Sequence, residues 1–190
     1  WVSQGVIMSW GVPDEMVIKD TVPFMAVKEY EYIRDLINSK NYKTALEWGA
    51  GSSTIWFPEN TNVEYWVSIE HNKKYVDYLK DKVCDKVNLL HIEDKNDYVN
   101  AAHGLLGRPV QLGKIEYEKN SFDFILIDGL YRDECLDKAM ELRAEGGTII
   151  LHDSGRAAYK DWYSKYPYKT IFEGEGWLGD GWDHRGLCEF

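Results

Sequence analysis

The amino-acid sequence predicts an α/β fold built on a doubly wound, mostly parallel sheet of seven strands, the last of which is antiparallel. Short apolar runs alternate with stretches whose apolar residues recur at helical spacing, and parallel strands require helical crossovers of this kind. Each of the first five runs ends at glycine or at a polar or charged residue, as buried strands do. Two further strand-like pieces, joined by a loop rich in Gly and Trp, end the chain and suit an antiparallel pair.

The order of elements follows from this pattern. The strands are expected at residues 44–48, 63–69, 87–92, 122–127, 148–152, 169–173 and 187–190. The helices are expected at residues 24–39, 73–82 and 132–143, with a short one that begins near Ser53. Segment 97–119 is polar and contains several glycines, so no firm structure is assigned to it. Gly146 and Gly147 are expected to end the last helix before the fifth strand begins.

Length and composition indicate one globular domain that covers residues 1–190, with residues 1–23 as an N-terminal arm or lid. No apolar run approaches the ~20 residues that a membrane span needs, so no membrane span is expected and the expected location is the cytoplasm. Because the chain starts at Trp1 rather than Met, we interpret it as a piece excised from a longer polypeptide. Cys84, Cys135 and Cys188 are widely spaced, which predicts three reduced thiols.

The charge of the chain disfavours nucleic acid as a partner. Its formal net charge is -10, and its Lys and Arg residues are scattered rather than gathered into a basic stripe. Phosphate backbones are repelled at long range by such a surface. The sequence leaves the oligomeric state open.

Polar residues follow each of the first five strands, at the edge where open α/β sheets bind ligands. Gly49, Gly51 and Ser52 come after the first strand, where glycines allow a sharp turn and free N–H groups suit a carboxylate. Glu70 ends the second strand, where an acid can accept hydrogen bonds from both hydroxyls of a ribose. The remaining strand ends carry Glu93, Asp94, Asp128, His152 and Asp153. Together these positions predict a nucleoside-type ligand.

Several of these stretches resemble the class I S-adenosylmethionine-dependent methyltransferases. Residues 45–54 (ALEWGAGSST) resemble motif I of that family, of the type E-x-G-x-G-x-S-T. Ile69 and Glu70 resemble its acidic ribose-binding position, and residues 122–129 (FDFILIDG) resemble its fourth-strand motif. Residues 142–153 resemble the L-x-x-G-G approach to the fifth strand. The likeness covers roughly residues 24–155. Trp48 is a departure, because many members have a smaller residue there.

The resemblance implies a Rossmann-like methyltransferase fold with S-adenosyl-L-methionine as cofactor. By the family's pattern, Glu47, Gly49 and Gly51 would hold the methionine part, Glu70 the ribose and Asp94 the adenine. The same cofactor site is expected to include Ser52, His71 and Asp128.

Asp128, His152 and Asp153 are the candidate catalytic residues, since a hydroxyl acceptor must lose its proton and these side chains end adjacent strands. Asp128 and Asp153 also resemble the two acids that bind magnesium in catechol-type and macrolide-sugar O-methyltransferases. Two carboxylates suit such a hard cation, so Mg²⁺ or Mn²⁺ is a candidate metal. The alternative is that Asp128 caps the following turn and Asp153 bonds to loop amides.

A narrower likeness points to the acceptor. Residues 152–156 (HDSGR) are similar to the H-D-x-x-R segment of plant glucuronoxylan O-methyltransferases. With the Trp-rich ends of the chain, this favours a sugar hydroxyl, so the expected partner is a glycan or small-molecule acceptor. Arg156 would hold an anionic group. The predicted acceptor-binding residues are Tyr131, Arg156, Trp182 and His184.

The sequence bears on three other functions. A dehydrogenase is disfavoured because Thr54 stands where a G-x-G-x-x-G motif needs its third glycine after Gly49 and Gly51. Methylation of a protein or a small amine is disfavoured because no N-P-P-Y-like cluster follows the fourth strand. A non-catalytic nucleoside-binding module remains open, because the glycines and acids predict only that a cofactor binds.

Overall fold

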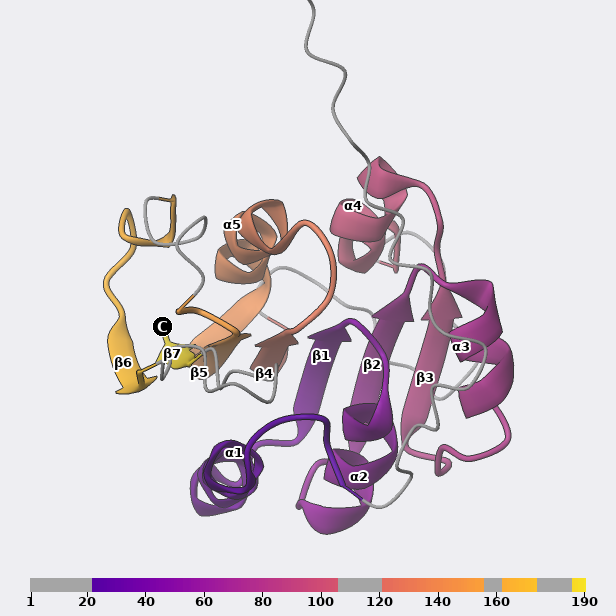
Figure 1. The fold of residues 1–190 in the computed structure, drawn as a ribbon, viewed down its shortest axis with the longest axis horizontal. Coiled ribbons are helices and arrows are strands. Elements are labelled where there is room, and N and C mark those ends of the chain that lie inside the picture. The colour runs from indigo at the N-terminus through magenta and orange to yellow at the C-terminus, as the bar shows by residue number, and fades with distance from the viewer. Residues whose placement is uncertain (1–21, 106–120, 156–161, 174–185) are drawn as a thin grey trace, which may run out of the picture.

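The computed structural model describes residues 22–105, 121–155, 162–173 and 186–190 (Figure 1). Strands and helices alternate along most of this length, as the sequence predicts. The strands are β1 (Thr44–Trp48), β2 (Tyr65–Glu70), β3 (Val87–His91), β4 (Phe122–Ile127), β5 (Arg143–His152), β6 (Lys169–Phe172) and β7 (Leu187–Glu189). The helices are α1 (Val27–Lys40), α2 (Ser52–Asn60), α3 (Lys73–Leu79), α4 (Lys95–Leu105) and α5 (Arg132–Leu142).

The seven strands form one sheet in the order β3-β2-β1-β4-β5-β7-β6. β1 to β5 are parallel, whereas β7 runs antiparallel to both β5 and β6. The prediction of a mostly parallel sheet with an antiparallel strand at its C-terminal side is therefore confirmed. The strand order reverses between β1 and β4, and this switch point is where open α/β sheets bind their ligands.

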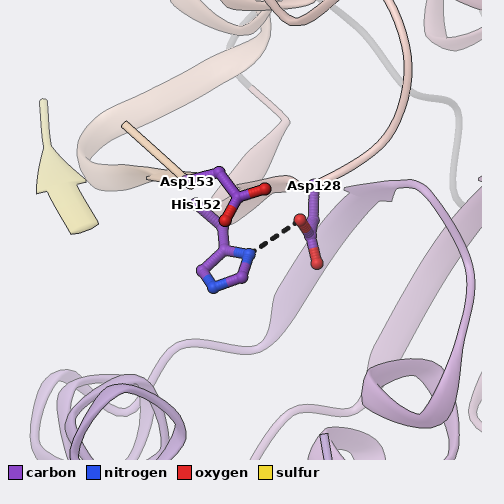
Figure 2. Close-up of side chains that lie close together, drawn as sticks. All are labelled: Asp128, His152 and Asp153. Atoms are coloured by element: carbon purple, nitrogen blue, oxygen red, sulfur yellow. Dashed lines mark hydrogen bonds and ion pairs between the residues drawn. The ribbon is translucent and has the colours of Figure 1, made fainter. Parts of the chain in front are cut away.

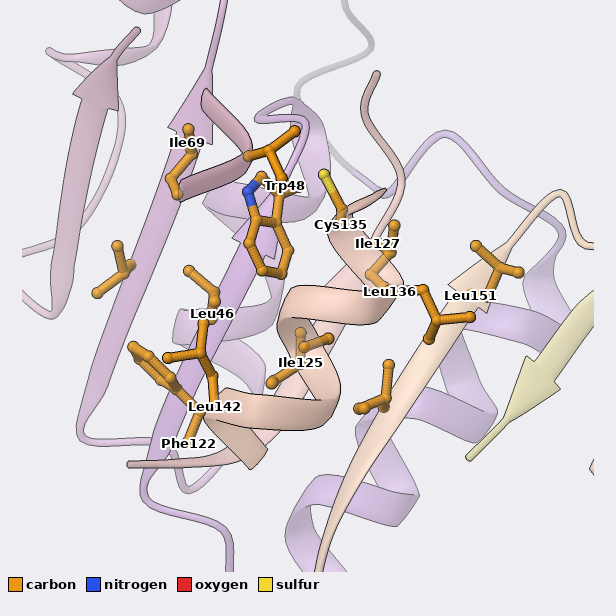
Figure 3. Close-up of a cluster of buried hydrophobic side chains, with 14 of the residues drawn as sticks. Leu46, Trp48, Ile69, Phe122, Ile125, Ile127, Cys135, Leu136, Leu142 and Leu151 are labelled. Atoms are coloured by element: carbon orange, nitrogen blue, oxygen red, sulfur yellow. The ribbon is translucent and has the colours of Figure 1, made fainter. Parts of the chain in front are cut away.

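Helices cover both faces of the sheet. Successive residues of a strand point to opposite faces, and apolar residues of the strands on both faces are buried. On one face α4 and α5 cover Leu46, Trp48 and Ile69, and Leu136 of α5 packs among them (Figure 3). On the other face α1 and α2 pack over Trp66, with Ile33 of α1 in the same cluster. In Figure 1 these two pairs of helices lie on opposite sides of the sheet.

Two elements differ from the sequence prediction. The first is α4, which covers the start of segment 97–119, where the sequence predicts no firm structure. This helix packs on the sheet through the buried side chains of Tyr98 and Val99. β5 begins at Arg143, and Gly146 and Gly147 lie inside it instead of ending the helix. Between the paired positions Phe122–Arg143 and Phe124–Thr148 the register shifts, and Gly146 has a φ of 78°. The glycines therefore form an irregularity in the ladder.

Several smaller predictions are also settled. All three cysteines are free, and Cys135 and Cys188 are buried. Trp48 is fully buried, and its indole N–H donates to the carbonyl oxygen of Tyr98 at 3.1 Å, so the fold accommodates the large side chain. In the described part of the chain no helix is long and apolar enough to cross a bilayer. Residues 1–21 of the predicted arm lie outside the described residues.

Gly49 and Gly51 have different environments and so give a matched pair of substitutions. Gly49 has a φ of 97°, and a Cβ there would lie 2.6 Å from the Cα of Gly129. A Cβ on Gly51 would meet only the Oγ of Ser53, at 4.0 Å. We expect Gly49→Ala to lower the free energy of unfolding by at least about 1–2 kcal/mol, through the left-handed backbone and the clash. Urea unfolding, followed by circular dichroism, would measure this.

Gly51→Ala is the control, and its free energy of unfolding should stay within about 1 kcal/mol of the wild type. Equal destabilisation by the two substitutions would contradict the assignment of Gly49 as the close contact between β1 and β4.

Candidate cofactor and acceptor site

The candidate site lies at the carboxyl edge of the sheet, around the switch point between β1 and β4. The turn after β1 contains Gly49 and Gly51, and β2 ends one strand away at Glu70. On the other side of the switch point, Asp128 follows β4 and His152 is the last residue of β5. The structure thus brings to one edge the strand-end residues that the sequence analysis selected.

The turn after β1 is held by its backbone. The N–H of Gly49 donates to the carbonyl oxygen of Ile69 at 2.9 Å, and the N–H of Asp128 donates to that of Trp48 at 2.9 Å. The absence of a side chain at Gly49 allows its backbone to touch Gly129, because a Cβ there would lie 2.6 Å from the Cα of Gly129. At Gly51, at the start of α2, a Cβ would have only the Oγ of Ser53 within 4 Å among the described residues, and the N–H of Gly51 donates to Oγ1 of Thr54 at 3.0 Å. Gly51 is therefore the less crowded of the two glycines.

Glu47 lies fully buried beneath this turn. Its carboxylate accepts hydrogen bonds from the hydroxyls of Ser53 at 2.5 Å and Thr54 at 2.7 Å. It accepts two more, from Ser68 and from the indole N–H of Trp66, at 2.8 and 3.0 Å. Burial raises the pKa of Glu47, while these hydrogen bonds act to lower it. Through these hydrogen bonds Glu47 fixes the start of α2. Its expected contact with the methionine part of the cofactor stays a prediction.

Glu70 is also buried, but its carboxylate is less occupied. Its Oε1 accepts the backbone N–H of Asn72 at 2.7 Å and lies 2.8 Å from Nδ1 of His71. Within the described ranges, Oε2 makes no hydrogen bond. The hydrogen bond to Glu70 raises the pKa of His71. An acid at this place, with an oxygen to spare, matches the predicted ribose-binding position.

Three aromatic rings form a row that begins at His71, the neighbour of Glu70. Tyr98 of α4 stands edge-on to His71 and to Tyr131, with ring centroids 6.3 and 6.1 Å apart. His71 and Tyr131 are both partly exposed, and Tyr98 is buried. Sequence reasoning missed Tyr98 because its helix was not predicted. Asp94 is exposed, and its side chain accepts the N–H of Asp97 at 3.0 Å, as a residue at the start of α4 does.

Asp128, His152 and Asp153 form the acid–histidine cluster, shown in Figure 2. One side-chain ligand atom from each lies within 4.8 Å of the other two. Nδ1 of His152 is 2.8 Å from Oδ1 of Asp128, and its Nε2 is 3.4 Å from Oε2 of Glu29. The sequence prediction that these three side chains would meet at adjacent strand ends agrees with this geometry.

Two charged residues join the cluster that sequence reasoning did not select. Glu29 comes from the first turn of α1, which also uses its carboxylate to accept the N–H of Ala26. Arg132 is the first residue of α5 and lies 3.1 Å from Asp128 and 3.5 Å from Asp153. Both side chains are buried, and each stands on the apolar face of its amphipathic helix. A charged residue at the spacing of an apolar face is the sequence signal that could have found them.

The surroundings of His152 change its expected role. Burial acts to lower its pKa, but Asp128, Glu29 and Asp153 outweigh burial and raise the pKa to about 10. At neutral pH the imidazole is therefore protonated, and both nitrogens donate to carboxylates. A protonated imidazole cannot accept a further proton, so these surroundings do not favour the expected role of His152 as a general base.

The backbone is strained at the site. Tyr131 and Asp153 adopt left-handed conformations, with φ values of 49° and 57°, although neither is glycine. Such conformations cost energy and persist where the surrounding structure imposes them, which is common at functional sites. Of the other predicted residues, Ser52 is buried at the start of α2, whereas Arg156, Trp182 and His184 lie outside the described residues.

Comparisons with solved structures agree with this architecture. A candidate caffeoyl-CoA O-methyltransferase from Staphylococcus aureus matches with a TM-score of 0.64 and 17% identity, over 88% of this chain and 84% of that one. A tRNA methyltransferase from Aquifex aeolicus matches with a TM-score of 0.58 and 13% identity, over 89% and 70%. An M. jannaschii protein in complex with AdoMet matches with a TM-score of 0.50 and 13% identity, over 86% and 73%.

The chain thus has the Rossmann-like fold of class I methyltransferases, with its sheet order and its antiparallel β7. No protein-family model matches the chain, and neither does any curated protein. At these low identities the likeness establishes the fold, so the activity must be argued from the site.

The raised pKa of His152 predicts a pH-dependent contribution to stability. Because the folded-state pKa of about 10 exceeds the ordinary 6.5, protonation stabilises the fold fully below about pH 6.5. This contribution is lost as the pH rises from there toward 10. We expect His152→Gln to be less stable than the wild type near neutral pH, by an amount that shrinks toward pH 10. Urea unfolding at several pH values, with a chelator present, would measure the difference.

Groups other than His152 titrate in both proteins, so they largely cancel in the difference between the two. A difference that is constant or grows with pH would show that His152 is not protonated in the folded protein.

Proposed function

We propose that this chain is an S-adenosylmethionine-dependent O-methyltransferase that transfers a methyl group to a hydroxyl, most favourably that of a sugar or glycan. The observation that supports this best is the division of the carboxyl edge into two halves. A glycine turn and the acid Glu70 lie on one side of the switch point, and the acid–histidine cluster lies on the other. A cofactor half beside a proton-accepting half is what methyl transfer to a hydroxyl requires.

The residues of the cofactor half fit S-adenosylmethionine. The chain is uncrowded at Gly51, at the start of α2, and the backbone N–H groups of the first turn of that helix suit the carboxylate of the methionine part. Glu70 has a carboxylate oxygen to spare for the ribose, and the neighbouring His71 offers a partly exposed ring to the cofactor. Asp94 is the acid expected beside the adenine amine. When bound, the cofactor would supply an electrophilic methyl group on a sulfonium.

The chain's own residues would align the acceptor and take its proton. A hydroxyl placed beside the acid–histidine cluster can donate its hydrogen to a carboxylate oxygen of Asp128 or Asp153. Protonated His152 and Arg132 pair with Asp128, and Arg132 also pairs with Asp153, so these contacts fix both carboxylates in position. His152 is therefore a positioning residue in this proposal, and the two aspartates are its candidate bases.

The choice of acceptor rests on charge and on the sequence likeness. A net charge of -10 opposes a polyanion such as RNA, although one protein of similar fold is a tRNA methyltransferase. Tyr131, which is 38% exposed, provides a ring on which a sugar can stack. Methylation of an amine or of a protein side chain, and cofactor binding without catalysis, are the alternative outcomes.

The cofactor part of the proposal is tested by calorimetric titration of S-adenosylmethionine and S-adenosylhomocysteine. We expect saturable binding that Glu70→Ala weakens about 10- to 100-fold, the effect of losing charge-assisted hydrogen bonds to a ribose. Glu64→Ala is the matched control, because Glu64 precedes the other end of β2 and is 71% exposed in a pair with Lys43. Folded wild type that binds neither compound would overturn the proposal.

The acceptor part is tested with S-adenosylmethionine that carries a radiolabelled methyl group. Oligosaccharides, small phenols, amines and tRNA would be offered in parallel, and Asp153→Asn and Asp128→Asn compared with the wild type. We expect label in the sugar fraction as an alkali-stable methyl ether, with a turnover number at least about 100-fold lower in one of the two variants. Label in amines or tRNA, with none in hydroxyl acceptors, would contradict the O-methylation proposal while leaving cofactor binding intact.

A further inference from the structure

The side chain of Arg132 fills the space between the ends of β4 and β5. Arg132 is 7% exposed and belongs to the first turn of α5, which directly follows the Asp128 loop. Its guanidinium lies 3.1 Å from Oδ1 of Asp128 and 3.5 Å from Oδ2 of Asp153. These are the two acids whose pairing resembles a magnesium site in the sequence. A fixed positive charge thus already stands between them.

Three backbone carbonyl oxygens hold the guanidinium in this place. Its Nε–H donates to the carbonyl oxygen of Gly129 at 2.9 Å. One terminal nitrogen donates to the carbonyl oxygen of Asp128 at 3.0 Å, and the other donates to that of His152 at 2.5 Å. If the side chain swung away, three carbonyls at a largely buried place would lose their donor, which is costly. The guanidinium is therefore a lasting part of the site.

A divalent metal does not fit beside this guanidinium. Mg²⁺ binds oxygen ligands at about 2.1 Å and Mn²⁺ prefers similar oxygen ligands. Oδ1 of Asp128 already forms an ion pair with Arg132 at 3.1 Å and lies 2.8 Å from Nδ1 of His152. A metal on that oxygen would lie within about 5 Å of the guanidinium, where two positive charges repel strongly in a poorly solvated place. The ligand atoms of Asp128, His152 and Asp153 lie close enough together to hold a metal ion. However, the positive charge of Arg132 already balances the two carboxylates.

We infer that Arg132 is the built-in cation of the acceptor site, in place of a divalent metal between Asp128 and Asp153. The inference goes beyond the proposed function, since it concerns which cation the two aspartates hold and does not require methyl transfer. Whatever reaction the site performs, Arg132 acts in it as a positioning residue. The consequence is that removal of the guanidinium should turn a pair of compensated acids into a metal site.

The test is a titration of the purified chain with Mn²⁺, followed by the electron paramagnetic resonance signal of the free ion. Wild type should show no saturable Mn²⁺ binding that depends on Asp128 or Asp153. Arg132→Met, which removes the charge and keeps much of the volume, should bind one Mn²⁺ saturably, at least about tenfold more tightly than any binding that the wild type shows. Arg132→Lys, which keeps a positive charge, is the matched control and should resemble the wild type.

Two further variants identify the site and keep the test decisive. Arg132→Met combined with Asp153→Asn should lose the gained Mn²⁺ binding. If Arg132→Met does not fold, the comparison of wild type with Asp128→Asn and Asp153→Asn still decides. Mn²⁺ binding by wild type that either asparagine variant abolishes would overturn the inference, whereas wild-type binding that neither changes lies elsewhere and agrees with it.

Discussion

The candidate site depends on one constraint, which is that its buried ionisable groups must be compensated inside the protein. Asp128 is the centre of this compensation, because its Oδ1 meets both His152 and Arg132. Through these contacts β4, β5 and α5 are tied at their ends, and His152 adds α1 through Glu29. Breaking one partner would leave the others charged and poorly solvated, so the four elements hold one arrangement at the carboxyl edge.

Buried carboxylates are satisfied by different kinds of donor in the two halves of that edge. Around the turn after β1, the carboxylate of Glu47 is satisfied by neutral hydroxyl and indole donors. Around the switch to β4 and β5, the carboxylates are satisfied by a guanidinium and an imidazolium. The ion pairs make the second half respond to pH, because they raise the pKa of His152. This division suits a half that only binds and a half that handles a proton.

Sequence patterns predicted most of the sheet because each parallel strand is a short apolar run that ends at a polar residue. They failed where tertiary contacts decided the outcome. α4 is mostly polar and reveals itself only through the burial of Tyr98 and Val99, and the glycines of β5 form an irregularity that resembles a helix end. At the site, the strand-end positions were predicted, since topology places them. Glu29 and Arg132 were not, because their partners lie on other elements.

The roles of predicted residues were harder to foresee than their positions. His152 ends the expected strand, yet the carboxylates of Asp128, Glu29 and Asp153 raise its pKa. Spacing in the sequence does not show how many acids will surround a side chain. The same holds for the two aspartates, whose pairing resembles a metal site until Arg132 is placed beside them. A guanidinium cannot acidify a hydroxyl by direct coordination as a metal does. A methyltransferase built this way would have to rely on alignment of the acceptor and on a carboxylate fixed beside it by Arg132.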